Sequence, residues 1–562
     1  MIGINLLFSL LLLFASSIFA NQIIFDKSEL NNDFNNKKYI SEIGDEKNLN
    51  FLNLFNKKKS KDIENLLSII PTKNSNPVVQ DLIFEILTSK KKIDKSLVSS
   101  EEDNQIFELY ISKLFDTGRI NEIELYYSQY PDLKKNEFIL KKMIEGNLLR
   151  NRHNEACKIL DNKSDKMPEV FGKILIICDI INNRFEEAKL GLLLLKELNE
   201  PGNVFFIDLA YSLMSEKKIN DSESLKKQLT EIKSLNPIIM SSLQFADISP
   251  NYEQIASLSI SGLLSILSNP TVDTDLKIYC SEILVKQKRI EVDMLSQAYQ
   301  LSRFKNSDIE NSLKIYKTLS PAKARPLLFQ SILKEKNSEQ KLKKIIALLR
   351  SSQIDNLFGP ISDLVFELVP AEKGMISNED KLLLSRMFQS KNKIFEANNI
   401  LNDFDGKDLS SDVYERKISL LVKQILNGNY LDEDKLREYL TSLGKKEKIT
   451  SEKLKKILMV LTLNAELPQD IINLISNFNF TESDKSTKGN LQNIFLVEKF
   501  SQNKDLFNSL EIFFRILSNR DFEELSLLEN YQILKILKNF SFDDYYKRLI
   551  ENILQWILKI QI

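Results

Sequence analysis

Apolar residues recur at every third or fourth position over much of the chain beyond residue 101, which is the spacing of one helix face. Ile106, Tyr110 and Leu114 follow this spacing, and a polar turn at residues 116–118 ends the segment. Alternating apolar runs are scarce, so the pattern predicts an all-α chain. Further helices are expected over residues 123–130, 138–149, 155–160, 169–181, 185–198 and 204–214.

A short phrase, a polar turn that opens a helix, returns at a regular interval. It reads GRINEI at residues 118–123, NRHNEA at 151–156 and NRFEEA at 183–188. Its arginines, Arg119, Arg152 and Arg184, are 33 and 32 residues apart. That period is typical of stacked helical hairpins, because one hairpin cannot bury its apolar face without a neighbour. Weaker copies follow at residues 392–397 and 503–507.

This repeat pattern resembles that of the tetratricopeptide-like α-solenoids. The resemblance in sequence covers residues 101–235, and beyond them only the expected helical architecture is similar. The family's Trp-x-x-Leu-Gly-x-x-Tyr helix signature is absent, since Trp556 is the only tryptophan. The resemblance implies a superhelix of stacked antiparallel hairpins whose concave surface holds an extended peptide or a partner helix. No ligand-contacting residue can be carried over without the family's consensus positions.

Prolines, glycines and polar stretches divide the chain further. Residues 21–100 are expected to be disordered at first and then helical, and residues 101–235 to form the regular repeats. Residues 236–370 form a less regular helical segment, punctuated by prolines such as Pro250 and Pro360. Residues 371–562 are expected to hold further helical repeats that end in an apolar helix.

The first twenty residues have the layout of a signal peptide. Residues 2–19 carry no charged side chain, and small residues precede Ala20, the expected last residue removed. The positive residues that usually precede the apolar core are missing, and an uncleaved segment of this length would just span a bilayer. Both readings place the bulk of the chain outside the cytoplasm, in a bacterial periplasm or cell envelope, free or anchored through residues 2–19.

Composition and motifs exclude several functions. Lys and Arg number 77 and Asp and Glu 78, so the chain lacks the positive charge that nucleic-acid binding requires. His153, the only histidine, lies where a helix opens and is assigned to plain surface or to a helix N-terminus. With one histidine and no phosphate-binding loop or nucleophile elbow, we expect no histidine-based catalysis, no metal site and no cofactor.

Cysteine spacing points to a disulfide. Cys157 and Cys178 lie on consecutive expected helices, with Pro168 about midway between them, so an antiparallel hairpin would bring them to similar heights. In an oxidising compartment they are expected to form a bridge, the alternative being two small buried apolar residues. Cys280 is expected to be buried and free.

The last helix is apolar over most of its circumference, although the ends of a solenoid normally need a polar outer face. Leu549, Ile553, Trp556 and Ile560 share one face, a candidate docking surface. It must be covered by the chain's own helices, by another protein or by a second copy. A capping-box-like pattern places the start of the helix at Ser541.

The leader, the repeats and the missing motifs together predict an exported, non-enzymatic scaffold or adaptor that binds a protein or peptide. The alternative is an accessory factor of a cell-wall (peptidoglycan) enzyme, or a glycan-cleaving enzyme that uses only carboxylates, since two acids suffice for glycoside hydrolysis.

Overall fold

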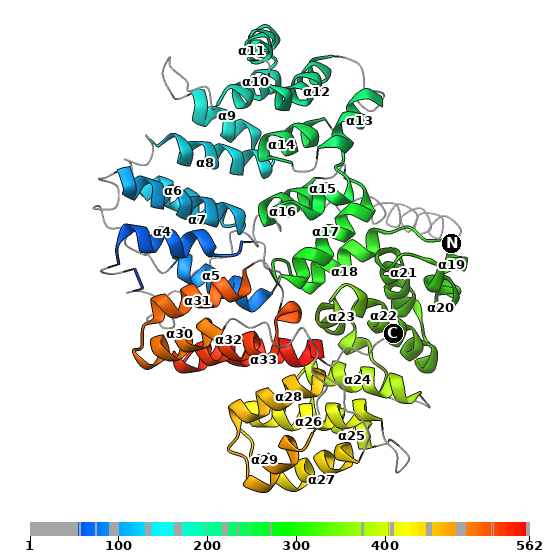
Figure 1. Cartoon of the computed structure of the whole chain (residues 1–562). Coiled ribbons are helices and arrows are strands. Elements are labelled where there is room, and N and C mark those ends of the chain that lie inside the picture. The colour runs from blue at the N-terminus through cyan, green and yellow to red at the C-terminus, as the bar shows by residue number, and fades with distance from the viewer. Residues whose placement is uncertain are drawn as a thin grey trace, which may run out of the picture. The chain divides into compact units, whose positions relative to one another are not determined.

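The structure, a computed structural model, is all-helical over the residues that it describes, as the apolar spacing predicts. The description runs from residue 54 to residue 557, with gaps at 56–57, 73–75, 89–100, 130–135, 162–170, 199, 216–222, 233–234, 247, 270–271, 372–375, 403, 405–409, 446–451, 479–490, 519 and 521. Within these residues there are thirty α-helices, α4 to α33, and no strand (Figure 1). The expected leader and most of residues 21–100 lie outside the described residues.

The chain forms two compact units. The first contains Gly118–Asp273, together with Met1–Leu49, which are not described. Its helices are α7 (Ile120–Gln129), α8 (Glu137–Leu149), α9 (His153–Asp161), α10 (Gly172–Ile181), α11 (Phe185–Glu197), α12 (Val204–Met214), α13 (Glu223–Glu231), α14 (Pro237–Phe245), α15 (Tyr252–Ala256) and α16 (Ile260–Ser268).

The second unit combines Asn50–Thr117 with Thr274–Ile562, so its chain leaves to build the first unit and returns. Its earlier helices are α4 (Ser60–Ile69), α5 (Pro77–Thr88), α6 (Glu101–Asp116), α17 (Thr274–Lys286), α18 (Val292–Leu301), α19 (Asn306–Glu310), α20 (Ser312–Ile315), α21 (Pro321–Lys334), α22 (Ser338–Ile354), α23 (Phe358–Val365) and α24 (Asn378–Ser390). Its later helices are α25 (Ile394–Asn402), α26 (Ser411–Leu426), α27 (Glu433–Gly444), α28 (Glu452–Asn464), α29 (Gln469–Ser476), α30 (Leu491–Gln502), α31 (Leu506–Leu517), α32 (Leu527–Asn539) and α33 (Asp543–Ile557). The division of the sequence at residues 100, 235 and 370 stays a prediction.

The repeated phrase is a helix-ending turn in which one residue adopts a left-handed backbone. Asn151 and Asn183 have φ of 56° and 59°, a conformation that asparagine tolerates better than most residues. After Asn151, the Arg152 N–H donates to the Asn147 carbonyl across six residues. This bond defines a Schellman motif, which satisfies carbonyls left over at the helix end and starts the next helix at once.

The same left-handed turn continues through the second unit, where the sequence phrase is weak. The turns at Asn356, Asn392 and Gly428 are 36 residues apart, so the hairpins there are regular. The sequence analysis identified the turn at Asn392 as a weak copy but missed those at Asn356 and Gly428, because the residues that follow them do not repeat the phrase. Other residues with positive φ between consecutive helices are Gly118 of the first unit and Lys288, Lys504, Ser518 and Ser541 of the second.

The first two helices of the second unit pack against two of its last helices. Helix α4 packs against α31, and α5 packs against α33, although these pairs lie more than 400 residues apart in sequence. Just before α4, Phe55 meets the edge of Phe507, and the Lys58 Nζ lies 4.7 Å from the centroid of the Phe507 ring and 3.6 Å from the Asp505 carboxylate. The first described segment of the chain is thereby joined to the last hairpins.

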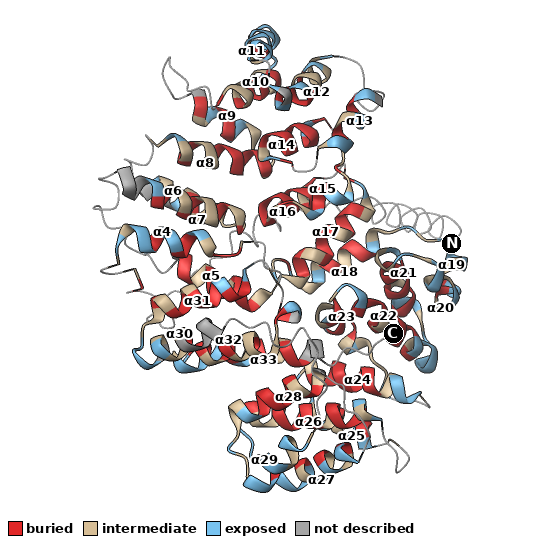
Figure 2. Ribbon diagram, in the orientation of Figure 1, coloured by how far each residue is buried: buried red, intermediate tan, exposed pale blue. Residues whose placement is uncertain are grey.

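The buried side chains lie along the helices where the hairpins pack against one another (Figure 2). The core of the first unit joins apolar side chains of α8 to α12 and α14, and it includes both Cys157 and Cys178. The final helix begins at Asp543, and Ser541, expected at its start, is instead the left-handed residue of the preceding turn with φ of 56°. The Phe542 N–H donates to the Leu537 carbonyl there, so a Schellman turn takes the place of the predicted capping box.

Candidate functional site

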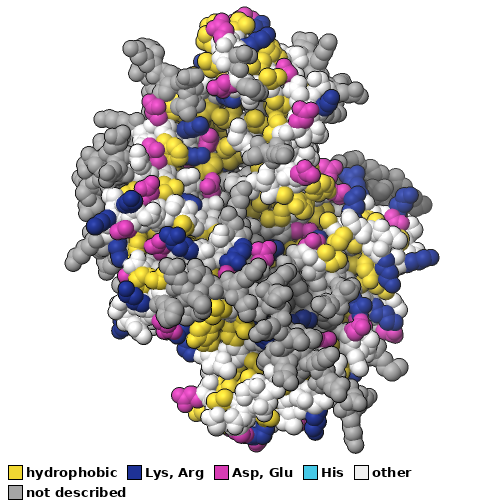
Figure 3. Space-filling model, viewed as in Figure 1, with side chains coloured by type: hydrophobic (Ala, Val, Ile, Leu, Met, Phe, Trp, Pro, Cys, Tyr) yellow, Lys and Arg dark blue, Asp and Glu magenta, His cyan; other side chains and the backbone are white. Residues whose placement is uncertain are grey.

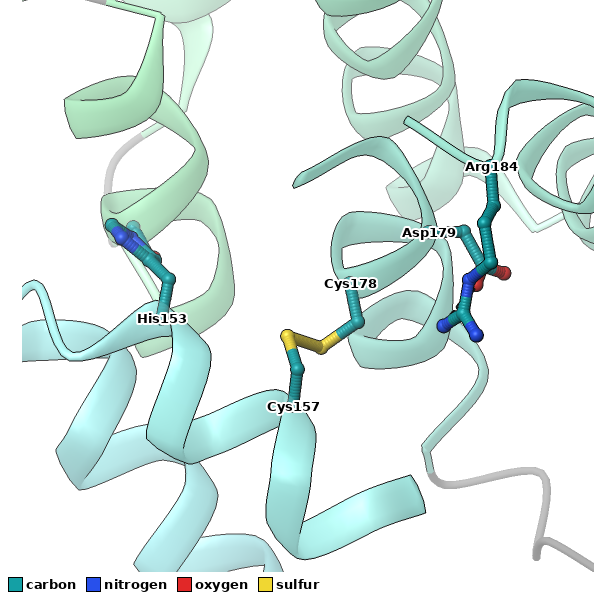
Figure 4. The surroundings of a disulfide bond; sticks show 6 residues. His153, Cys157, Cys178, Asp179 and Arg184 are labelled. Carbon is teal, nitrogen blue, oxygen red and sulfur yellow. Dashed lines mark hydrogen bonds and ion pairs between the residues drawn. A yellow bond between two sulfur atoms is a disulfide. The ribbon is translucent and has the colours of Figure 1, made fainter. Parts of the chain in front are cut away.

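A disulfide joins two consecutive helices of the first unit. Cys157 on α9 and Cys178 on α10 have their sulfur atoms at bonding distance, with Cα atoms 5.5 Å apart (Figure 4). Both side chains are buried, so the bridge joins two helices inside the core. Cys280, in the second unit, is buried without a disulfide partner, and burial raises the pKa of its thiol.

His153 lies at the N-terminus of α9 and is half-buried rather than free on the surface. Its Nε2 is 3.0 Å from the Ser241 Oγ of α14, and its ring meets the edge of the Phe245 ring at 5.9 Å. The only histidine of the chain therefore makes a packing contact between two hairpins.

Helix α10, held to α9 by the disulfide, supports α11 on its other side. The inner face of α11 is fully buried at Ala188 and Leu192. Gly191 lets the two helices approach closely, because a Cβ atom there would lie 2.7 Å from the Cγ1 of Ile176 on α10. A glycine inside a helix normally weakens it, so its presence is explained by this packing.

The opposite face of α11 is apolar as well, and it is open to solvent. Leu190, Leu193, Leu194 and Leu198, which we call the α11 leucine face, are between 49% and 61% exposed. Hydrophobic side chains gather over this helix at the top of the molecule in Figure 3. Val204 and Tyr211 of α12 are also exposed. Contiguous exposed apolar side chains on a soluble protein commonly mark an interaction site.

Charged residues frame the α11 leucine face, and acids outnumber bases. Glu186 and Glu187 occupy the first turn, where the helix dipole favours acids. Glu197 and Glu200 lie at the other end, and the bases of this segment are Arg184, Lys189 and Lys196. The Lys189 Nζ binds the Glu186 carboxylate at 2.7 Å, and the Arg184 Nη2 binds the Asp179 carboxylate at 2.8 Å. The face thus combines an apolar row with a net negative border.

The predicted docking face of the C-terminal helix is buried where the structure describes its side chains. Leu549 and Ile553 are 1% and 3% exposed, because α33 packs against α5, α24, α26, α28 and α32 of the same unit. These two side chains are therefore closed to a partner. The Trp556 side chain and Ile560 lie outside the described residues.

The sequence analysis located α11 but not its exposed apolar face. The segment around it reads KLGLLLLKEL, which is apolar on every side, so spacing alone cannot tell which leucines face the core. The available signal was the excess itself, because a surface helix needs only one apolar stripe.

Among the residues that the structure describes, no group of three or more His, Cys, Asp or Glu side chains is placed to hold a metal ion, and no helix is long and apolar enough to cross a membrane. Comparison with known protein families, curated proteins and solved structures found no match. The fold and the surface alone therefore define the class of protein, a chain of α-helical hairpins with an exposed apolar helix face.

Proposed function

We propose that this protein is an exported, non-enzymatic scaffold of the tetratricopeptide-like α-solenoid type, which binds an amphipathic helix of a partner protein on the α11 leucine face. The observation that carries the proposal is a row of exposed leucines on a helix whose inner side is fully packed. The recurrence of hairpins that turn at one left-handed residue supports the solenoid assignment. The leader pattern and the cysteine pair favour the periplasm or cell envelope.

The acidic residues beside the α11 leucine face favour one kind of binding partner over two others. An anionic lipid surface would be repelled by Glu186, Glu187, Glu197 and Glu200. A second copy would bring the same acidic excess to the contact, so it supplies no complementary charge. An amphipathic helix with lysine or arginine beside its apolar row satisfies both the leucines and the acids.

The test uses the full chain and a fluorescent amphipathic helix made of leucine and lysine. We expect saturable binding by anisotropy, weakened about tenfold or more in an L190E/L194E double variant, since each covered leucine contributes roughly 1.5–3 kcal/mol. Both positions are exposed, so the variant should melt like the unchanged protein. The matched control is F395E, at a 74% exposed phenylalanine in the second unit, which should bind normally.

Three results would contradict the proposal. Equal binding by the double variant would place the partner elsewhere. A dimer in sedimentation that the double variant abolishes would make the second copy the occupant. Vesicle binding that the double variant abolishes would make it a lipid surface. Weaker binding of a leucine and glutamate helix than of the lysine helix would support the role of the acidic border.

A further inference from the structure

The contact between α5 and α33 holds more negative than positive charge. Asp81 and Glu85 lie one turn apart on α5, and Asp544 and Arg548 lie one turn apart on α33. The Arg548 guanidinium binds the Asp81 carboxylate and lies 3.5 Å from that of Asp544. Three carboxylates therefore share one guanidinium, and Glu85 is the one of the three that forms no ion pair with the described residues.

Glu85 is bound instead by a neutral donor. The Tyr545 hydroxyl, on α33, donates to the Glu85 carboxylate. Tyr545 is buried, and burial raises the pKa of its hydroxyl, so it remains a donor at neutral pH. Glu85 itself is half-buried at this contact. Its charge is therefore less hydrated than that of a free glutamate, and two other carboxylates lie near it.

Burial and the neighbouring acids act against the charge of Glu85. Burial raises the pKa of its carboxyl, and the charges of Asp81 and Asp544 raise it further, against the Tyr545 hydrogen bond and the Arg548 charge. Protonation removes the repulsion between the carboxylates. It keeps the hydrogen bond, because a protonated carboxyl still offers an oxygen acceptor to Tyr545. The contact therefore fits the neutral form of Glu85 better than the charged form.

Two further polar contacts hold the ends of α5. In its first turn, the Arg289 Nη2 donates to the Gln80 Oε1 at 3.0 Å. In its last turn, the Tyr110 hydroxyl of α6 donates to the Leu87 carbonyl. The groups that act on Glu85 itself are Asp81 on its own helix and Asp544, Tyr545 and Arg548 on α33.

We infer that the α5–α33 contact is a pH-responsive clasp, which tightens when Glu85 takes up a proton and loosens when it ionises. Since the folded contact favours the protonated form, its full contribution to stability is present at low pH and is lost as the pH rises through the raised pKa of Glu85. The clasp joins one of the first described helices to the last helix of the chain, so the pH sets how firmly the second unit is closed. It is independent of the α11 leucine face, which lies in the first unit.

The test follows hydrogen exchange of the full-length protein from mildly alkaline to mildly acidic pH, with rates corrected for the intrinsic pH dependence of exchange. We expect the protection of α33 to rise as the pH falls. E85Q should give the high protection at every pH, because glutamine is neutral and keeps an oxygen acceptor for Tyr545. At mildly alkaline pH the gain should be about tenfold for a difference of one in pKa between the closed and open contact.

The matched control is E529Q, at a partly buried glutamate of α32 whose hydrogen bonds lie the other way. Against the effect of burial, bonds from Arg520 and Ser526 lower the pKa of Glu529, so its charged form is the stabilising one. E529Q should therefore reduce the protection of α32, opposite in sign to the effect of E85Q on α33.

The opposite signs separate the clasp from damage to the fold, since damage cannot raise protection. Two results would overturn the inference. One is an E85Q protein in which α33 is no better protected at mildly alkaline pH than in the unchanged protein. The other is an E85Q protein in which the protection of α33 still rises on acidification as it does in the unchanged protein.

Discussion

Arg548, on the last helix of the chain, forms an ion pair with Asp81, which precedes it by 467 residues. Beside this pair, Tyr545 of α33 hydrogen-bonds Glu85 of α5. Burial raises the pKa of Glu85 despite that bond. These contacts join the second described helix of the chain to the last, and they identify α33 as the element that closes the second unit.

Removal of α33 should therefore destabilise the protein strongly. Truncation after Phe540 exposes the surfaces that Leu549, Ile550 and Ile553 cover, each worth roughly 1.5–3 kcal/mol. We expect a lower melting temperature and increased light scattering from the truncated chain. R548Q is the control, because a partly exposed ion pair contributes less than about 1 kcal/mol. An unchanged melt after truncation would show that α33 is not part of the fold.

The bridge between α9 and α10 should persist in exported protein. Non-reducing peptide mapping should link Cys157 to Cys178, and Cys280 should react with an alkylating reagent only after denaturation, because its thiol is buried and its pKa raised. In the chain-entropy model, a C157A/C178A variant loses about 3 kcal/mol of stability. Three reactive thiols in oxidised envelope fractions would contradict the bridge.

The left-handed turns predict opposite effects for two substitutions at one residue. Lys288, exposed and at φ of 52°, pays the steric cost of a left-handed backbone, about 1–2 kcal/mol. K288G should remove that cost and raise the melting temperature, whereas K288V should lower it because a β-branched side chain fits the turn worse. Equal melting of the two variants would mean that the turn relaxes to another conformation.

Local features of the chain were readable from its sequence. Three and four residue spacing predicted helices because it reports which side chains share a helix face. The phrases at Asn151 and Asn183 predicted turns because asparagine enters the left-handed region at low cost. Cys157 and Cys178 could be paired in advance because both belong to one hairpin, where the sequence separation of 21 residues sets their relative heights.

The tertiary structure decided everything that depends on distant residues. Leu192 and Leu193 are neighbours of the same type, yet Leu192 is buried and Leu193 exposed, because only the position of α10 determines which side of α11 is covered. Glu85 comes close to Asp544 only once α33 has returned to α5, so neither helix by itself shows the excess of carboxylates. Periodicity records the faces of a single helix, whereas contacts between helices depend on packing of the whole chain, which is why the surface and the clasp were not visible in the sequence.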